Sequence, residues 1–571
     1  MPLVHNIGVK TPDVTSTMKP ALADTLDRAL DLVLRDSVSV KDFGALGNYN
    51  TTTQTGADDT AAFQAAIDSL GPTYRNGGMR QIRVPAGTYL ITALVLPAVL
   101  SFGVEFVGEG IMSTHIRSPK SNTSPLFTVN IEFVRFRNIS FYGSTTDNDV
   151  STPANWKQTC YFGKLGWNAA DLDVSFINCK FSMFVDAIEG HGRGIVTDGC
   201  IFAGVTNEMH VVADPDIIWV PGSASNSQYT GARHYTMRNG RSDATSRVLL
   251  ITGTATWKHY IHDVMLIGND YAVVDRLVDA QDATLRRVII ANNNSILSFR
   301  GGVIQAKGLN VFSITGNSFN SAYDDTVNPS SASDCISHLI LGANSLFAGT
   351  VSSNTMKCLR TNFIETTSGS NIVITNNVFP SAWILPANTD HYVYFSGTDC
   401  PGLVIDNNVF QAASTSGNYH LFSTAQVNKS TSIGTNPSPW GWDTEALTYT
   451  PVVSSSTGTW VTSGKYTVSG GYCTVDYVLI GTGLTDTTGN IAVTLPITAV
   501  PSSRLSSYSG GGGVYKLDGF SNTGASMLAG TVSAGTAFVF NRSTNLISTV
   551  LSWADRASST VGIMGSIRYK V

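Results

Sequence analysis

Charged side chains are scarce in this chain: Asp, Glu, Lys and Arg make up 13% of its 571 residues, and the formal net charge is -5. Because no stripe of Lys and Arg is present, we expect no nucleic-acid partner. No apolar run is long enough to span a bilayer, so we also expect no membrane insertion. The N-terminus lacks the basic and apolar regions of a signal peptide, which predicts synthesis in the cytoplasm without Sec export.

The chain also lacks the usual signatures of metal and nucleophile sites. Its seven cysteines are odd in number and contain no Cys-x-x-Cys pair, which argues against a zinc site or a disulfide framework and favours buried reduced thiols. His191, His210 and His234 do not have metal-ligand spacing, so we expect no metal and no cofactor. Without a Gly-x-Ser-x-Gly elbow, an esterase is disfavoured.

Turn-forming and β-branched residues are abundant instead, and 53 residues are Gly, which favours an all-β fold. A short unit recurs about every 20 to 40 residues: a strand, an Asn or Gly corner that tolerates left-handed backbone, and an inward aromatic ring. A parallel β-helix is the simplest explanation of this repeat, with the five terminal rings stacked in its interior. These rings are Phe181, Phe202, Phe319, Phe379 and Phe410.

The stretch from 38 to 91 reads as the beginning of such a stack. Asp58, Asp59 and Thr60 are suited to accept from the free amides of a first helical turn, and an amphipathic helix follows them. A helix of this kind can cover the first apolar layer of a solenoid, whose open end would otherwise be exposed. The strand, corner and strand of Ile82 to Ile91 come next.

These motifs resemble the opening of the pectate-lyase-like right-handed β-helix proteins, especially bacteriophage tailspikes. The resemblance rests on Lys-Asp-Phe-Gly-Ala (41–45), Asp-Asp-Thr (58–60) and Val-Pro-Ala-Gly-Thr-Tyr (84–89), which occur in this order. It implies a virion protein of the phage tail that binds and depolymerises a bacterial surface polysaccharide at the cell surface. The resemblance also favours a homotrimer, attached through its N-terminus to a baseplate or tail protein.

Three segments are expected along the chain. Residues 1–36 contain one helix with a short apolar stripe, which we place near the virion or against the chain's own solenoid. Residues 37–435 form the right-handed parallel β-helix, which carries catalysis and receptor binding. Residues 436–571 alternate like antiparallel strands with Gly-rich turns, which predicts a C-terminal β-sandwich for trimerisation or glycan binding.

Acids at matching positions of successive coils form a ladder, because neighbouring strands lie ~4.8 Å apart. Counting from the terminal rings places Asp186 five residues after Phe181, and Asn207 and Glu208 five and six after Phe202. Glu189 stacks over His210 by the same count. Aligning a degenerate coil brings Asp270 near this stripe. We expect Glu208 and Asp270 as acid and base, with Asp186 and Glu189 as the reserve pair. Further candidates along the solenoid are Asp324, Asp325 and Glu365.

A long insertion from 211 to 247 interrupts the coils beside these acids. Loops on a rigid scaffold concentrate binding groups, and aromatic faces stack on the apolar faces of sugars. We therefore expect the substrate-binding residues in and near this insertion. They are Trp219, Tyr229, Arg233, His234, Tyr235 and Tyr271.

Three functions remain open from the sequence. Glycosidic hydrolysis needs one carboxylic acid to protonate the leaving oxygen and one carboxylate to activate water or attack. Elimination on a uronic-acid polymer needs cationic stabilisation, which Arg233, Arg238, Arg241, Arg286 and Arg287 would supply. A non-catalytic adhesin would use the solenoid as a spacer. The nature of the sugar and of the host bacterium stays open.

Overall fold

The computed structural model describes residues 37–71, 79–97, 102–119, 124–164, 174–191, 194–212, 233–252, 260–296, 299, 301–320, 336, 338–359, 363–382, 391–395, 400–410, 420–422 and 432–433, and the strands β31 to β39 with a few flanking residues. The expected helix in residues 1–36 and the expected domain boundary near 435 lie outside the described residues.

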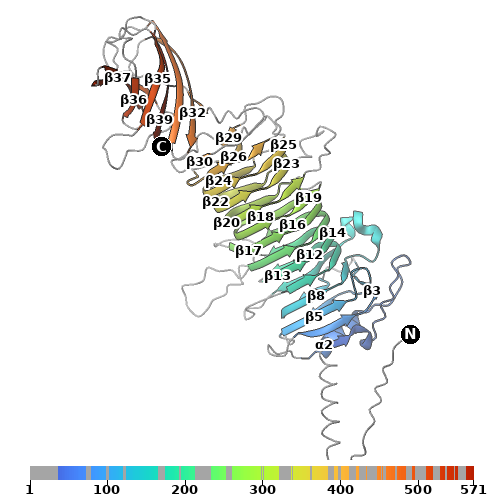
Figure 1. Ribbon diagram of the computed structural model, residues 1–571. Helices are drawn as coiled ribbons and strands as arrows, with labels where there is room; N and C mark the ends of the chain where they lie inside the picture. Colours follow the sequence, from blue (N-terminus) through green and yellow to red (C-terminus); the bar gives the residue numbers. More distant parts are fainter. Residues whose placement is uncertain are drawn as a thin grey trace, which may run out of the picture.

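The strands β1 to β30 pair in parallel and stack into one elongated β-helix with three faces (Figure 1). The parallel β-helix that the repeat predicts is therefore confirmed. Seven long strands bend around corners and contribute to more than one face. These are β12 (Lys180–His191), β14 (Ile201–Val212), β16 (Arg241–Thr252), β18 (Asp270–Ala291), β20 (Ile304–Thr315), β22 (Ile340–Ser352) and β24 (Ile364–Thr375).

Face 1 also contains β1 (Ser37–Ser39), β2 (Arg80–Val84), β5 (Phe102–Gly108), β8 (Glu132–Arg137), β11 (Val174–Ile177), β13 (Ile195–Asp198), β15 (Arg233–Arg238), β17 (Tyr260–Ile267), β27 (Val404–Asp406) and β30 (Ser432–Ile433). Face 2 contains β3 (Gly87–Leu90), β6 (Thr114–Arg117), β9 (Ser140–Tyr142), β19 (Asn294–Ile296), β21 (Ser318–Asn320), β23 (Thr355–Leu359), β25 (Val378–Ala382) and β28 (Val409–Phe410). Face 3 contains β4 (Leu94–Leu96), β7 (Phe127–Val129), β10 (Lys157–Lys164), β26 (His391–Phe395) and β29 (His420–Phe422).

The helices of the described residues are short; the first two lie at the start of the stack, and the last two lie beside β12. They are η1 (Val40–Phe43), α2 (Thr60–Ser69), η3 (Asp147–Ser151) and η4 (Pro153–Asn155). The buried Phe63 and Ile67 of α2 join the same apolar core as Ile82 of β2, so the helix covers the first layer as expected. Figure 1 shows α2 at this end of the stack.

The expected capping of α2 is only partly correct. Asp58 accepts a hydrogen bond from the Thr60 amide at 2.9 Å, as predicted. Asp59 instead accepts from the amides of Leu46 and Gly47, at 2.7 and 3.1 Å, and makes no side-chain cap. Its carboxylate therefore fastens the preceding loop to the helix.

The corner between face 1 and face 2 carries a ladder of buried asparagines. Each side-chain amide except the last donates to the Oδ1 atom of the next asparagine at 2.8–3.0 Å, and each also donates to a backbone carbonyl. The ladder consists of Asn269, Asn293, Asn317, Asn354, Asn377 and Asn408. The residue before each corner has the left-handed backbone that the repeat predicts, as at Asn292 (φ 55°) and Gly316 (φ 66°).

The aromatic interior follows the repeat where the coils are regular. Phe181 stacks on Phe202 with ring centroids 5.0 Å apart, and Phe319 and Phe379 are buried. Phe410 pairs in register with Phe379, but its side chain lies outside the described part of the chain. The stack is not continuous, because Ser242 replaces the ring in the coil after Phe202.

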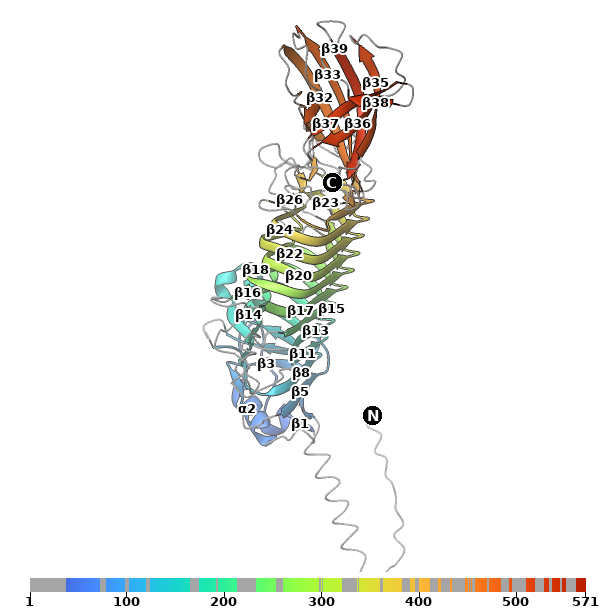
Figure 2. The same cartoon turned by 90° about the vertical axis from the view of Figure 1, so that its left-hand side faces the viewer.

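The strands β31 to β39 form one antiparallel sheet, which lies beyond the last coils of the β-helix (Figure 2). A second packed layer is not confirmed, so the β-sandwich stays a prediction. The strands are β31 (Leu447–Tyr449), β32 (Thr459–Ser469), β33 (Tyr472–Thr482), β34 (Ala492–Thr494), β35 (Gly510–Asp518), β36 (Leu528–Ser533), β37 (Ala537–Thr544), β38 (Ile547–Val550) and β39 (Val561–Lys570).

Two simpler expectations concern thiols and membranes. Cys160, Cys179, Cys200 and Cys400 are buried and free, which confirms the prediction of reduced thiols for these four. Among the described residues, no helix has the length and apolar character needed to cross a bilayer.

Candidate active site

The candidate site lies on face 3, where the long strands bend. In β12 the neighbouring residues Ala187 and Ile188 both turn into the core, so Asp186 and Glu189 on either side of them lie together on the outer side. The parallel register stacks Asn207 of β14 on Asp186 and His210 on Glu189. This confirms the expected stacking of Glu189 on His210.

Asp186, Glu189, His191 and His210 form what we term the acid–histidine cluster. His210 Nδ1 lies 3.1 Å from Asp186 Oδ2, and its Nε2 lies 2.7 Å from the Thr252 hydroxyl. His191 Nε2 lies 3.1 Å from Glu189 Oε1. The two carboxylates thus lie side by side, each next to an imidazole that can exchange a proton or carry a positive charge.

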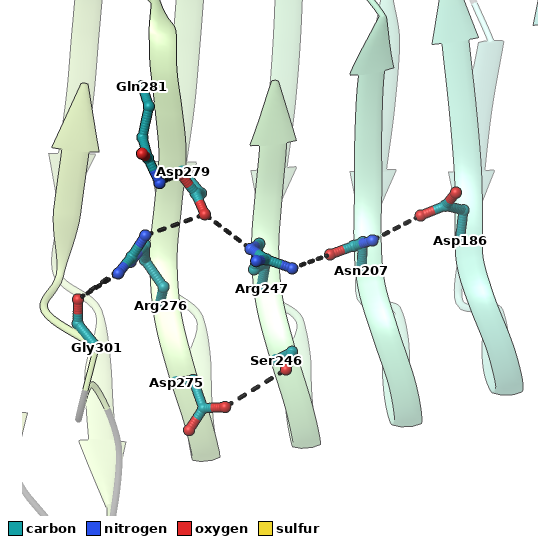
Figure 3. Close-up of polar contacts among 9 residues, drawn as sticks. All are labelled: Asp186, Asn207, Ser246, Arg247, Asp275, Arg276, Asp279, Gln281 and Gly301. Atoms are coloured by element: carbon teal, nitrogen blue, oxygen red, sulfur yellow. Dashed lines mark hydrogen bonds and ion pairs between the residues drawn. The ribbon is translucent and has the colours of Figure 1, made fainter. Parts of the chain in front are cut away.

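A chain of polar contacts runs from this cluster across the next three strands (Figure 3). The Asn207 amide donates to Asp186 Oδ1 at 2.7 Å, and Arg247 Nη1 lies 3.5 Å from Asn207 Oδ1. Arg247 Nε donates to Asp279 Oδ2 at 2.7 Å, and Arg276 Nη1 donates to the same oxygen at 3.0 Å. We term Arg247, Arg276 and Asp279 the arginine cluster.

Three atoms of the acid–histidine cluster could in principle hold a cation. One ligand atom each from Asp186, Glu189 and His210 lies within 4.8 Å of the other two. Both ring nitrogens of His210 already contact Asp186 and Thr252, however, so a metal would have to displace one of these contacts. The sequence-based expectation of no metal therefore stays a prediction.

Glu208 does not join the cluster. It lies next to Asn207 but turns inward and is 0% exposed, because two successive residues at this bend face the core. Burial raises the pKa of Glu208 to about 8, and the hydroxyls of Ser242 and Thr245 partly oppose that rise. These hydroxyls lie near the carboxyl group, but neither carboxyl oxygen of Glu208 forms a hydrogen bond within the described residues.

The expected alignment of Asp270 with Glu208 is wrong. Asp270 pairs with Arg241 on face 2, and it is Tyr271 that occupies the position of Phe202. The residue five positions after this ring is therefore Arg276, which stacks on Arg247. The degenerate coil was misaligned because Ser242 and Tyr271 replace the repeated Phe.

The expected sugar-binding residues are dispersed. Trp219 and Tyr229 lie outside the described residues, as do Asp324 and Asp325, and for Arg233 the structure describes only the backbone, in β15. His234 is exposed on face 1, with its Nδ1 3.1 Å from Asp263. Tyr235 and Tyr271 are 1% and 2% exposed, so neither offers an accessible face for stacking on sugar. Strand alternation turns Tyr235 inward because His234 faces out.

The arginines suggested for elimination are not on face 3. Arg238 pairs with Asp198 and Arg287 with Asp263, both on face 1, and Arg286 lies in the same strand segment as Arg287. Arg241 begins β16 on face 2. Arg247, Arg276 and Asp279 were not predicted. Aligning Ser242 and Tyr271 with Phe202 would have placed them on the ladder. Glu365 does lie on face 3, stacked beyond Asp279 through Gln305 and Leu341.

The chain is similar to several known proteins, although the similarity is low over most of its length. No protein-family model matches the chain. Among solved structures, the Dettilon tailspike protein is 12% identical with a TM-score of 0.49, covering 94% of this chain and 95% of that one. The tailspike protein of E. coli bacteriophage HK620 is 14% identical with a TM-score of 0.36, covering 96% and 95%. A tailspike of Acinetobacter baumannii bacteriophage Fri1, a capsular polysaccharide depolymerase, is 11% identical with a TM-score of 0.34, covering 94% and 86%.

A curated protein matches part of the sequence more closely. "Depolymerase 1, capsule K3-specific" of Klebsiella phage KP32 is 40% identical over 82 residues. This stretch covers 14% of the present chain and only 9% of that protein. The resemblance that the opening motifs predict is thus borne out: over these 82 residues, the chain is similar to a phage capsule depolymerase.

Proposed function

We propose that this protein is a phage tailspike enzyme that cleaves a bacterial surface polysaccharide by glycosidic hydrolysis on face 3 of its β-helix. The observation that carries the proposal is the pair of adjacent carboxylates of Asp186, which is 5% exposed, and Glu189, which is half-buried. One oxygen of each lies within 4.8 Å of the other. The stacked strands hold both groups on a rigid surface, which is what a catalytic pair requires. The partial similarity to a Klebsiella phage depolymerase supports a capsule as substrate.

The spacing of the pair favours hydrolysis with retention of configuration. Retaining glycosidases hold their carboxyl groups ~5 to 5.5 Å apart, whereas inverting ones leave ~6.5 to 9.5 Å for a water molecule. In this reaction Asp186 attacks the anomeric carbon while Glu189 gives its proton to the leaving oxygen. Glu189 then takes a proton from water, whose oxygen displaces Asp186 and releases the sugar.

The neighbouring side chains suit these roles. The Asn207 amide donates to Asp186 Oδ1, which fixes the carboxylate as an acceptor and orients its other oxygen. His191 lies against Glu189, and its side chain is 12% exposed. It is therefore placed to assist the return of the proton to Glu189.

Elimination on an acidic polymer is the second candidate function. Arg247 favours it, because a guanidinium near the acid–histidine cluster could bind and neutralise a uronate carboxylate while a histidine removes the adjacent proton. Such a lyase leaves an unsaturated sugar that absorbs ultraviolet light, and hydrolysis does not. A non-catalytic adhesin would leave the polymer at its original size.

The assembly belongs to the same proposal. We place three copies of the chain along one axis on the virion, attached through the N-terminal segment and acting at the bacterial surface. Sedimentation that gives a monomer at micromolar concentration would contradict the trimer.

The experiment is an incubation of the purified chain with a panel of Klebsiella capsular polysaccharides. Polymer size is followed by size-exclusion chromatography, ultraviolet absorbance reports elimination, and proton NMR of the fresh product reports the anomeric configuration. We expect shortened polymer, no new absorbance and a retained anomer. Unshortened polymer with persistent cell binding would instead support the adhesin.

A further inference from the structure

The arginine cluster takes no part in the chemical steps of hydrolysis, and Arg247 was assigned a role above only for elimination. We propose that Arg247, held in place by Asp279 and Arg276, forms a subsite for the carboxylate of an acidic sugar, so that the polysaccharide substrate is anionic. This inference rests on the proposed function and names the substrate class of the same site.

The first observation in favour of this subsite is the net charge of the arginine cluster. Asp279 is 4% exposed, and its Oδ2 accepts from both Arg247 and Arg276. The uncharged Gln281 donates to Oδ1 at 3.1 Å. Two guanidinium charges therefore share a single carboxylate, which leaves the cluster with a net positive charge at neutral pH.

The more accessible donors of the cluster belong to Arg247. Arg276 is anchored on both edges, since its Nε and Nη2 donate to the Gly301 carbonyl at 3.1 and 2.8 Å while its Nη1 donates to Asp279. Arg247 uses Nε for Asp279 and only a long 3.5 Å contact from Nη1 to Asn207. Its Nη2 has no protein partner within the described coils, and its side chain is 38% exposed.

The shape of these donors selects the ligand. A guanidinium offers two parallel N–H groups that match the two oxygens of a carboxylate, and the resulting hydrogen bonds are charge-assisted. Asp279 and Arg276 fix the orientation of Arg247 before the ligand arrives, which lowers the entropic cost of binding. A neutral sugar hydroxyl would use only part of this capacity.

Arg247 lies close to the proposed cleavage site on the same face. It occupies the same register position as Asp186, two strands further along face 3, which corresponds to ~9 to 10 Å. Figure 3 shows the intervening Asn207 connecting the two side chains. A polymer laid along face 3 would thus present a sugar neighbouring the cleaved linkage to Arg247.

The chain contains a matched control on face 1. Glu105 also contacts two arginines, Arg135 at 3.6 Å and Arg137 at 2.7 Å, and both are partly exposed. This group has the same charges but lies in β5 and β8, away from the acid–histidine cluster. Arg137→Gln therefore changes the net charge in the same way as Arg247→Gln without touching the proposed subsite.

The test measures binding of the full-length chain to acidic and neutral members of the capsule panel, at low and high NaCl. We expect acidic polymers to bind and their affinity to fall with salt. Arg247→Gln should weaken binding at least tenfold, Arg247→Lys should give an intermediate loss, and Arg137→Gln should match the parent. Melting temperatures identify any variant that fails to fold, and the Lys variant then still tests the subsite.

The outcomes separate this inference from the proposed function. Binding of neutral polymers alone, binding of no acidic polymer, or parental affinity in Arg247→Gln would overturn the subsite, even if the polymer is cleaved. Conversely, Arg247-dependent binding of an acidic polymer that is never shortened would support the subsite and contradict the enzyme. Reducing the carboxylates of the bound polymer to alcohols should lower its affinity as much as Arg247→Gln does.

Discussion

Asn207 donates its side-chain amide at 2.7 Å to Asp186, its register partner on the neighbouring parallel strand, and His210 Nδ1 lies 3.1 Å from Oδ2 of the same Asp186. One carboxylate thus receives contacts from two residues of the following coil. The three-residue separation of Asn207 and His210 spans the bend of face 3, so the bend itself assembles the site. The predictions below follow from this arrangement and from the buried polar groups around it.

Removing either carboxylate should abolish depolymerisation. Asp186→Asn removes the nucleophile and Glu189→Gln removes the general acid, and loss of a general acid typically slows a reaction ~10²- to 10⁴-fold. The rate of polymer shortening, measured by viscosity, checks this. Asp198→Asn, which alters a partly exposed acid on face 1, should leave the rate unchanged. Full activity in both cluster variants would move the site elsewhere on the chain.

The buried Glu208 should make stability depend on pH. Its folded-state pKa of about 8 lies above the ordinary glutamate pKa of 4.5, so the folded chain binds this proton more tightly than the unfolded chain does. The resulting stabilisation is complete below pH ~4.5 and is lost as the pH rises through about 8, a change of a few kcal/mol by order of magnitude.

Glu208→Gln tests this dependence because it keeps the shape and removes the titration. The melting temperature of the parent should fall more steeply between pH 5 and 9 than that of the variant. Parallel curves for the two proteins would show that Glu208 is not a buried acid. Activity is a separate readout, and we expect the variant to retain it, since Glu208 faces away from the outer side of face 3.

The asparagine ladder should contribute measurably to stability. Asn317→Ala removes the Oδ1 atom that accepts from both the backbone N–H and the side-chain amide of Asn293, and it removes one of the two donors to Asn354 Oδ1. A buried donor left without an acceptor costs ~1 to 3 kcal/mol. Thermal unfolding measures the loss. The exposed Asn294 of the same corner provides the control, and Asn294→Ala should change the melting temperature little. Equal shifts in both variants would contradict a structural role for the ladder.

Chelation should leave the activity intact. His210 is engaged on both ring nitrogens, and no step of the proposed hydrolysis uses a metal ion. Depolymerisation measured before and after dialysis against EDTA checks this expectation. A loss that Ca²⁺ or another divalent ion restores would instead make Asp186, Glu189 and His210 a metal site.

The sequence predicted the β-helix well because its repeat has local physical causes. Most of the left-handed corners are Gly or Asn, and an inward ring follows several of them, as at Asn178 and Phe181. The site was predicted only in part. Counting from Phe181 and Phe202 correctly stacked Asp186 on Asn207 and Glu189 on His210.

The errors arose where the periodicity fails. Counting in steps of two cannot show that both Glu208 and Met209 turn inward at the bend, so Glu208 was placed on the outer side. In the following coils Ser242 and Tyr271 occupy the ring position, and without a Phe to count from, Asp270 was aligned with the acid stripe, whereas it lies one position before the ring. The bend of the strands on face 3 and the substitution of the core ring therefore decide which acidic side chains lie together, and neither can be read from local sequence preferences.

Mass spectrometry of the oligosaccharides released from capsular polysaccharide tests the central claim most directly. Hydrolysis on face 3 predicts fragments whose mass equals whole repeat units plus one water, formed by the parent chain and absent with Glu189→Gln. Fragments lighter by one water would establish elimination. Release of no fragments, or fragments formed equally by Glu189→Gln, would contradict hydrolysis by the Asp186 and Glu189 pair.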